Sequence, residues 1–288
     1  MKSFSAVTMT AAFAGFLLCL GWPGDARAQT QGSSGGQSTT PTQKSGSGTP
    51  PAAPGAQQTP APPPANPQED ADYKALHAAK PDDFDTKIKL GEDFLTKYPL
   101  SKYSEAVDAE LVQAYFGKHD FVKMNASGDK ALALNPDDVS VLVRLGWVAP
   151  HNSDPNDLDA ERKLERAETE LKHALEVVNT LQKPAAMTDD AFASAKAQTT
   201  DMAHSGLGLV YFREGKFDLS ATELQQTTQG LTADPTDLYV LGIDLQRLSK
   251  FTDAQQAFEK CGESAGPLQN ACKQHAEQAK QQAAAKPK

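Results

Sequence analysis

Apolar residues in the middle of the chain recur at helical spacing and are interrupted by short polar breaks. In the segments 207–217 and 241–251, a Leu-Gly pair is followed by an apolar or aromatic residue four positions after the Leu and by a Phe ten positions after it. The two segments begin 34 residues apart, and so do Leu111 and Leu145. Because each polar break separates two runs of helical periodicity, the pattern predicts a helix hairpin that is repeated along the chain.

Prolines and glycines fit the ends and the packing of these hairpins. Pro136 and Pro235 follow the second runs of their units, where the missing N–H group stops one helix and the next helix can begin. A glycine beside the leucine, Gly208 or Gly242, lets neighbouring helices approach closely. A single hairpin cannot bury both of its faces, so we expect successive hairpins to stack around a continuous core.

The 34-residue unit resembles the tetratricopeptide repeat, which has Leu-Gly and an aromatic residue in its first helix, Ala and an aromatic residue or Leu in its second, and a proline at its end. The segment 235–267 matches it most closely, with Leu241-Gly242, Ala254 and Phe258 in phase. This resemblance implies an all-α fold, a right-handed superhelical solenoid of stacked helix hairpins. It also implies binding of a protein or peptide without catalysis.

The repeat pattern also divides the folded region into segments. We expect a degenerate N-terminal hairpin at 69–104, two repeat units at 105–180 with an insert at 149–157, two further units at 181–267, and a capping helix with a frayed tail at 268–288. A long link precedes the third unit, and the residues from Ala191 to Glu214 can then form one extended helix. We therefore expect an offset in the solenoid between the second and third units.

The first 28 residues have the composition of a secretory signal peptide. They start with Lys2, continue through an apolar stretch and end with Ala26-Arg27-Ala28. The apolar stretch is shorter than the roughly 20 residues that span a bilayer. We therefore expect cleavage and no integral membrane span afterwards, with an uncleaved anchor as the alternative. The segment predicts an exported protein, periplasmic or extracellular.

Residues 29–68 contain no Leu, Ile, Val, Met, Phe, Tyr or Trp, and they hold nine of the 19 prolines. Without apolar side chains a segment cannot offset the entropy cost of ordering its backbone, so we expect a disordered linker rich in Pro, Gly, Ser and Gln. The whole chain is acidic, with 28 Lys and Arg, 37 Asp and Glu, and a net charge of −9. This charge argues against a nucleic acid partner, which requires a concentrated basic surface.

The sequence holds no pattern of residues that supports catalysis. It contains no glycine-rich phosphate loop, no His-Glu-x-x-His and no nucleophile elbow, so we predict no catalytic residues and no cofactor. His119, His151 and His173 lack acidic or cysteine partners at metal-ligand spacing. The acidic segment 154–159 lacks the glycine and the final glutamate of a calcium loop. We therefore predict no metal site.

Cys261 and Cys272 are the two cysteines that remain once a signal peptide is removed. They fall on consecutive predicted helices joined by a Gly-Pro turn, and exported proteins commonly form disulfides. We predict a disulfide between them. A buried free thiol at Cys261 is the alternative.

In the tetratricopeptide family the first helix of each hairpin lines the ligand groove, so the resemblance makes residues on that helix the site candidates. Arg213 and Arg247 lie 34 residues apart and should stack in adjacent units. The other candidates, on equivalent helices, are Arg144, Trp147 and Tyr239. Guanidinium groups beside aromatic rings suit a carboxylate or an acidic peptide, because Arg offers a bidentate donor fork.

A structural role for Arg213 and Arg247 is the alternative to ligand binding. Both end their predicted helices, where the helix dipole favours a cation. Glu214 or Asp244 is also close enough in sequence to pair with them.

These predictions favour a non-enzymatic scaffold of the bacterial cell envelope that binds a peptide or protein segment in a tetratricopeptide groove. The segment 94–103 is also similar to the inter-repeat phrase of envelope repeat proteins that serve outer-membrane or division machinery. The first alternative is therefore a structural subunit of such an assembly, docked by its convex face. An enzyme with an unrecognised site is the remote alternative, since no acid, base and nucleophile cluster in the sequence.

Overall fold

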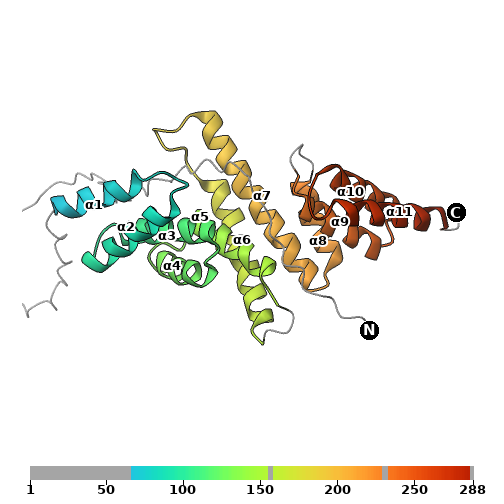
Figure 1. The fold of residues 1–288 in the computed structure, drawn as a ribbon, viewed down its shortest axis with the longest axis horizontal. Helices are drawn as coiled ribbons and strands as arrows, with labels where there is room; N and C mark the ends of the chain where they lie inside the picture. Colours follow the sequence, from blue (N-terminus) through green and yellow to red (C-terminus); the bar gives the residue numbers. More distant parts are fainter. Residues whose placement is uncertain (1–65, 155–157, 229–232, 286–288) are drawn as a thin grey trace, which may run out of the picture.

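A computed structural model describes residues 66–154, 158–228 and 233–285, and within these ranges it contains eleven α-helices and no strand (Figure 1). The helices are α1 (Pro67–His77), α2 (Phe84–Lys97), α3 (Ser104–Lys118), α4 (Phe121–Leu134), α5 (Val139–His151), α6 (Ala160–Thr180), α7 (Asp189–Arg213), α8 (Phe217–Thr227), α9 (Pro235–Arg247), α10 (Phe251–Glu263) and α11 (Gln269–Ala285). The all-α fold class expected from the sequence is confirmed.

Some of the sequence predictions concern residues outside the ranges that the structure describes. The predicted signal peptide at 1–28 and the predicted linker at 29–68, apart from its last three residues, lie outside the described residues. In the part of the chain that the structure describes, no helix has both the length and the apolar character that a membrane span requires.

The helices pack as consecutive pairs that follow the chain. α3 packs on α4, α5 on α6, α7 on α8 and α9 on α10, and each pair contacts the next pair (Figure 1). The first helices α3, α5, α7 and α9 also contact one another in order, whereas the second helices make no comparable contact across pairs. The first helices therefore form an inner layer, and α4, α6, α8 and α10 form an outer layer. This is the tetratricopeptide-like solenoid that the 34-residue spacing predicted.

The polar breaks are turns with a shared backbone conformation. His119, Gly215 and Ser249 each follow an inner helix, and their φ angles are 58°, 75° and 57°. The next residue donates its N–H group to a carbonyl five residues earlier, as Lys216 does to Tyr211 at 2.9 Å. A left-handed residue at this place satisfies a carbonyl group at the helix end and reverses the chain direction. The same turn conformation, with a left-handed residue after the inner helix, therefore connects the two helices in three of the hairpins.

The glycine beside the leucine allows the two helices of a hairpin to touch. A Cβ atom on Gly242 of α9 would lie 2.5 Å from the Phe258 ring of α10, and one on Gly208 of α7 would lie 2.5 Å from the Leu224 side chain of α8. Phe258 and Leu224 are both completely buried. The large side chain of the outer helix thus fills the space that the glycine leaves, which is the close packing expected of a protein core.

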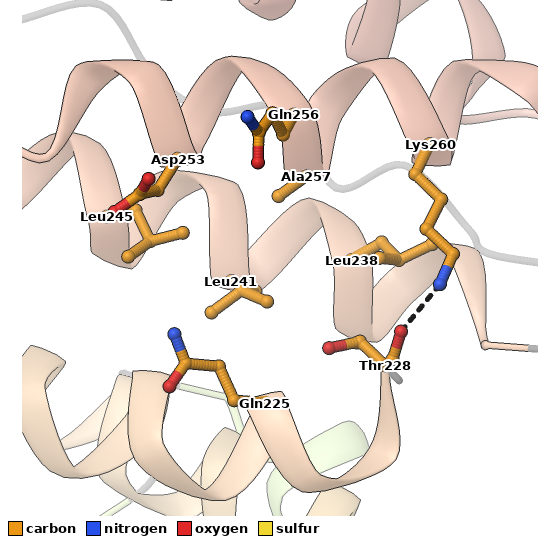
Figure 2. A pocket seen from close by; sticks show the side chains of 9 residues that line it. All are labelled: Gln225, Thr228, Leu238, Leu241, Leu245, Asp253, Gln256, Ala257 and Lys260. Carbon is orange, nitrogen blue, oxygen red and sulfur yellow. Dashed lines mark hydrogen bonds between the residues drawn. The ribbon is translucent and has the colours of Figure 1, made fainter. Parts of the chain in front are cut away.

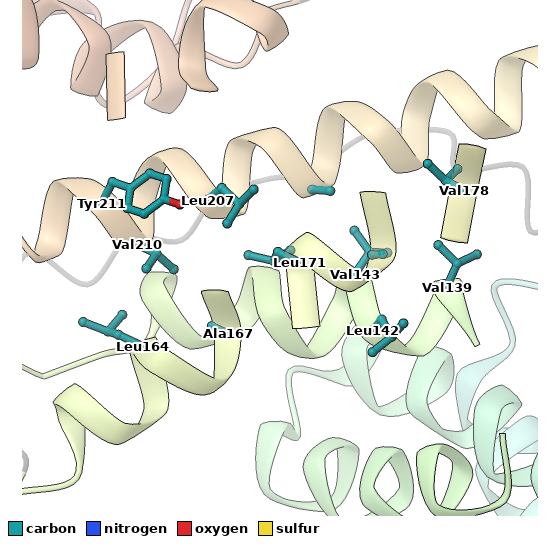
Figure 3. Packing of buried hydrophobic residues seen from close by; sticks show 12 residues of the cluster. Val139, Leu142, Val143, Leu164, Ala167, Leu171, Val178, Leu207, Val210 and Tyr211 are labelled. Atoms are coloured by element: carbon teal, nitrogen blue, oxygen red, sulfur yellow. The ribbon is translucent and has the colours of Figure 1, made fainter. Parts of the chain in front are cut away.

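The third pair begins with the longest helix, which joins the two halves of the stack. α7 has 25 residues and contacts α5 and α6 as well as α8 and α9 (Figure 1). Val143 of α5, Leu171 of α6 and Leu207 of α7 belong to one buried apolar cluster at this junction (Figure 3). The extended helix predicted at 191–214 is therefore present as α7.

The segment predicted as an insert at 149–157 is partly helical. α5 continues to His151, with Pro150 inside its last turn. Pro150 has no N–H group to donate to the Gly146 carbonyl, so α5 lacks one backbone hydrogen bond in its last turn, and the helix ends one residue later. The connection to α6 therefore starts at Asn152, and residues 155–157 lie outside the described part of the chain.

Polar and aromatic contacts hold α1 on the N-terminal end of the stack. Tyr98 donates its hydroxyl hydrogen to Asp72 at 2.8 Å, and Tyr103 donates to Asp70 at 2.8 Å. The Tyr73 ring stacks on the Tyr103 ring, with centroids 4.1 Å apart. The pair α1 and α2 therefore closes this end of the stack.

A disulfide holds the opposite end. α11 packs on α10, and Cys261 of α10 is joined to Cys272 with a Cα separation of 5.8 Å. Both cysteines are completely buried. The disulfide predicted from the sequence is therefore present. In the chain-entropy picture a crosslink across so short a loop contributes on the order of 2 to 3 kcal/mol.

Replacing Gly242 by Ala should destabilise the fourth hairpin, because the added methyl group has to displace the buried Phe258 ring. Overpacking of this kind costs about 1 to 3 kcal/mol. Thermal unfolding of the full chain, followed by circular dichroism, should show a lower midpoint for Gly242→Ala. Gly266→Ala is the matched control, because no atom lies within 4 Å of a Cβ there. Equal midpoints for the two variants would contradict the helix packing.

Candidate binding surface

Trp147 lies in an aromatic and polar cluster of the inner layer. Its ring stacks on His151 with centroids 3.6 Å apart, and the Phe116 ring of α3 meets it edge to face at 5.8 Å. The Trp147 indole N–H donates to the Ser205 hydroxyl of α7 at 3.3 Å. Trp147 therefore connects α3, α5 and α7.

His151 is a neutral ring beside Trp147. Its Nδ1 atom donates to the Trp147 carbonyl oxygen at 2.6 Å, because a carbonyl group can only accept. Burial lowers the pKa of His151 to about 4, although the Trp147 carbonyl and Asp234 act in the opposite direction, and the Arg213 guanidinium lowers it further. At neutral pH the ring therefore carries no charge. Arg213 is close enough to influence it.

A hydrogen-bonded chain continues from Ser205 to the fourth pair. Ser205 donates to Oδ1 of Asp237 on α9 at 2.9 Å, and the Thr227 hydroxyl of α8 lies 3.0 Å from Oδ2. Asp237 is 3% exposed. Burial, reinforced by the negative charge of Asp234, raises the pKa of Asp237 to about 7 in spite of these hydrogen bonds. The chain of contacts links α5, α7, α8 and α9, so it joins three successive pairs.

Arg213 and Arg247 lie in the last turns of α7 and α9, and both side chains are exposed. The Arg247 guanidinium lies over the Phe217 ring of α8, 5.7 Å from its centroid. Because α7 and α9 are in contact, the two arginines end neighbouring helices of the inner layer. The expected stacking of the two arginine side chains on each other stays a prediction.

The carboxylates suggested from the sequence as partners of these arginines are engaged elsewhere. Glu214 forms an ion pair with Lys216 at 2.8 Å, and Asp244 is completely buried. Within the described ranges neither Arg213 nor Arg247 forms an ion pair. Their position at helix ends still allows a favourable effect on the helix dipole.

The two remaining candidates are partly engaged with neighbouring groups. Arg144 donates from Nη1 to the Ser140 carbonyl of its own helix at 2.7 Å. The Tyr239 hydroxyl lies 3.3 Å from His275 of α11, and its ring meets the Phe258 ring edge to face at 5.8 Å. Tyr239 is therefore shared between the inner layer and the C-terminal helix.

The outer layer has an open hollow between α8 and α10 (Figure 2). Its volume is about 280 Å³, and the α9 residues Leu238, Leu241 and Leu245 form its floor. At its edge, Lys260 donates to the Thr228 carbonyl at 2.6 Å. The three leucines are at most 5% exposed, so the floor offers little apolar surface to a ligand.

The buried acids of α9 lie away from the hollow. Asp237 and Asp244, whose pKa values are both raised to about 7, lie between packed helices, and neither lines the hollow. In the same part of the chain, no group of three or more His, Cys, Asp or Glu residues is placed to hold a metal ion.

Sequence reasoning did not identify Ser205, Thr227 or Asp237 as parts of this network. Asp237 lies in the first turn of α9, where an acidic residue ordinarily stabilises the helix dipole from the solvent side. Ser205 precedes Gly206 in a run of small residues that suggests helix packing alone. Nothing in one sequence distinguishes such a buried hydroxyl or carboxyl group from an exposed one.

No protein-family model and no curated protein matches the chain. Among solved structures, a thermophilic tetratricopeptide repeat protein of Thermus thermophilus is similar to it, with 18% sequence identity, coverage of 74% of this chain and 99% of the other, and a TM-score of 0.44. A similarity of this size adds nothing to the fold described above, which rests on the helix contacts themselves.

Replacing Ser205 by Ala should weaken the joint between α5, α7 and α9, because Trp147 and Asp237 each lose a hydrogen-bond partner. The loss of a partner for a buried polar group costs about 1 to 3 kcal/mol. Thermal unfolding should show this loss, and so should a change in Trp147 fluorescence in a Trp22→Phe background, since the chain has two tryptophans. Ser194→Ala, at an exposed position of α7, is the control. An unchanged Trp147 spectrum in Ser205→Ala would argue against the network.

Proposed function

We propose that the protein is a non-enzymatic scaffold that binds an acidic peptide or protein segment along the inner layer formed by α5, α7 and α9. The observation that carries the proposal is the pair of exposed arginines, Arg213 and Arg247, at the ends of neighbouring inner helices and without an ion-pair partner among the described residues. In a protein with a net charge of −9, two such cations favour an anionic group from outside the chain.

The chemistry of the surface fits an extended segment. Each guanidinium can donate two parallel hydrogen bonds to one carboxylate, so two arginines one repeat apart select acidic side chains at two points along the bound segment. Trp147 and its neighbours Phe116 and His151 offer aromatic surface on the adjacent helices. The hydrogen bonds through Ser205 support a preformed surface, and a preformed surface reduces the entropy cost of binding.

An envelope location is part of the proposal. The predicted signal peptide at 1–28 favours export, and the disulfide between Cys261 and Cys272 is compatible with an oxidising compartment such as the periplasm or the extracellular space. The predicted linker at 29–68 would separate the folded stack from its point of attachment.

The arginine pair can be tested by charge reversal. Arg213→Glu combined with Arg247→Glu should weaken binding of fluorescein-labelled peptides that contain Asp, Glu and aromatic residues by at least about tenfold, because attraction becomes repulsion at two points. Fluorescence anisotropy with the full chain measures this change. Binding to the unmodified protein should also weaken as the salt concentration rises, since exposed charges are screened.

The matched control for this experiment is Arg162→Glu combined with Lys163→Glu on the exposed face of α6, which makes the same change in net charge on the outer layer. Equal losses of affinity in the two double variants would indicate a general charge effect and would overturn the assignment to the inner layer. No loss in either variant would also overturn it.

A second candidate function, a structural subunit docked by the outer layer, is favoured by the distribution of exposed apolar side chains. Val122 and Leu134 of α4 are 82% and 60% exposed, and Leu219 of α8 is 44% exposed. All three belong to outer helices. Exposed apolar side chains on the outer helices are available as contacts for a docked protein.

Co-purification from crosslinker-free cell extracts distinguishes the two candidates. An apolar interface should survive washing at high salt and should be lost in Val122→Asp combined with Leu219→Asp, because two charges would be buried there. The arginine variants should leave such a complex intact. A complex that dissociates at high salt, or that persists in the aspartate variant, would exclude docking by the outer layer.

A further inference from the structure

Asp244 of α9 is a completely buried carboxyl group at the contact between the third and fourth pairs. Its Oδ2 atom lies 2.5 Å from the Ser220 hydroxyl of α8, and its Oδ1 atom has no hydrogen-bond partner among the described residues. A carboxylate with a single hydrogen bond and no cation is costly in such surroundings. The charge state of Asp244 therefore matters for the stability of this contact.

The number of hydrogen atoms available between Ser220, Gly208 and Asp244 indicates which charge state of Asp244 fits the geometry. The Ser220 hydroxyl lies 2.8 Å from the Gly208 carbonyl of α7 as well as 2.5 Å from Asp244. A hydroxyl group carries one hydrogen, and a carbonyl group can only accept. When Ser220 donates to Gly208, the hydrogen between Ser220 and Asp244 must come from Asp244. The protonated acid therefore satisfies both contacts and ties α9 to α7 and α8.

Within the described ranges, no charged neighbour opposes this protonated state. The charged side chains of the helices packed against α9 include His204 and Arg213 of α7, Asp218 and Glu223 of α8, and Asp253 and Lys260 of α10. They are exposed or engaged in other contacts, as in the His204 to Glu223 pair at 2.6 Å. Burial raises the pKa of Asp244 to about 7. A hydrogen bond donated by Ser220 to the carboxylate lowers this pKa, and that effect is lost when Ser220 donates to the Gly208 carbonyl instead.

Asp237 repeats the arrangement two turns earlier on α9. The Thr227 hydroxyl lies 3.0 Å from Asp237 and 3.1 Å from the Leu224 carbonyl, so one hydrogen again serves two acceptors. The carboxyl groups around Asp237 are Asp234 before α9 and Asp201 of α7, and both disfavour a negative charge on it. Two buried acids of α9 thus face α7 and α8.

We propose that α9 is a proton-dependent latch, in which protonated Asp244, supported by Asp237, ties the C-terminal helices α9, α10 and α11 to the rest of the stack, and that loss of the proton lets this end open more readily. The disulfide keeps α10 and α11 together in both states. The latch therefore acts on the α9 contact with α7 and α8, where the inner layer continues into the fourth pair. This inference does not depend on the identity of a bound partner.

The direction of the pH effect follows from linkage. The pKa of Asp244 is raised from 3.8 in the open state to about 7 in the closed state, so the closed state binds the proton more tightly. Its contribution to stability is complete below pH 3.8, is lost as the pH rises towards about 7, and does not change further above that. For a single proton the opening constant rises by up to about tenfold per pH unit in this window.

Hydrogen exchange of the full chain, read by mass spectrometry, tests the latch. After correction for intrinsic exchange, the opening constant for peptides of α9 should rise at least about tenfold between about pH 5 and 7, while peptides of α4 serve as an internal reference. Asp244→Asn, whose amide can still donate to Ser220, should reduce this pH dependence clearly. Asp253→Asn, at an exposed position of the neighbouring helix, should leave it unchanged.

A pH dependence of α9 opening that is the same in Asp244→Asn as in the unmodified chain would overturn the proposal. Should Asp244→Asn fail to fold, NMR of the unmodified chain with ¹³C-labelled aspartate gives an independent answer. The latch requires aspartate carboxyl carbons that titrate above about pH 6, well beyond an ordinary aspartate. If all aspartates titrate below about pH 5, the latch does not exist.

Discussion

The contact between a glycine of the inner helix and a large apolar side chain of the outer helix sets the spacing within three of the pairs, α5–α6, α7–α8 and α9–α10. Gly146, Gly208 and Gly242 each leave room for a buried Leu or Phe of the outer helix at 2.5 Å from the position of a Cβ atom. Leu171 also packs against Gly206 of the next pair. Leu171 therefore contacts the inner helix of its own pair and the inner helix of the next pair.

Such close packing leaves few places for polar groups, and several of the buried ones lie where pairs meet. Ser205 and Asp237 join three pairs, and Ser220 and Asp244 join the last two. Each buried hydrogen bond adds little net stability, but an unsatisfied partner costs much more. These groups therefore act mainly as constraints on how neighbouring pairs are oriented. The charged arginines, by contrast, remain at the edge of the inner layer, where solvent or a partner can satisfy them.

The stacked architecture provides an extended surface and a hollow that is nearly closed at its floor. A stack of hairpins offers a long surface made from several helices, whereas the hollow of about 280 Å³ in the outer layer has a floor that is almost closed. The two ends are closed by different means, with polar and aromatic contacts at α1 and a disulfide at α11. Both ends protect apolar surface that a terminal repeat would otherwise expose.

Features that depend on nearby residues could be predicted from the sequence: the helices, the turns between them, the 34-residue repeat and the disulfide between residues 11 apart. The burial of particular polar groups, and the partners that they contact, depend instead on how the helices pack. Trp147 meets Ser205 across 58 residues, and Tyr239 meets His275 across 36. These contacts depend on the rotation and offset of whole helices. Small differences in side-chain packing decide how each helix is rotated against its neighbours. The hydrophobic periodicity of the sequence does not show these differences.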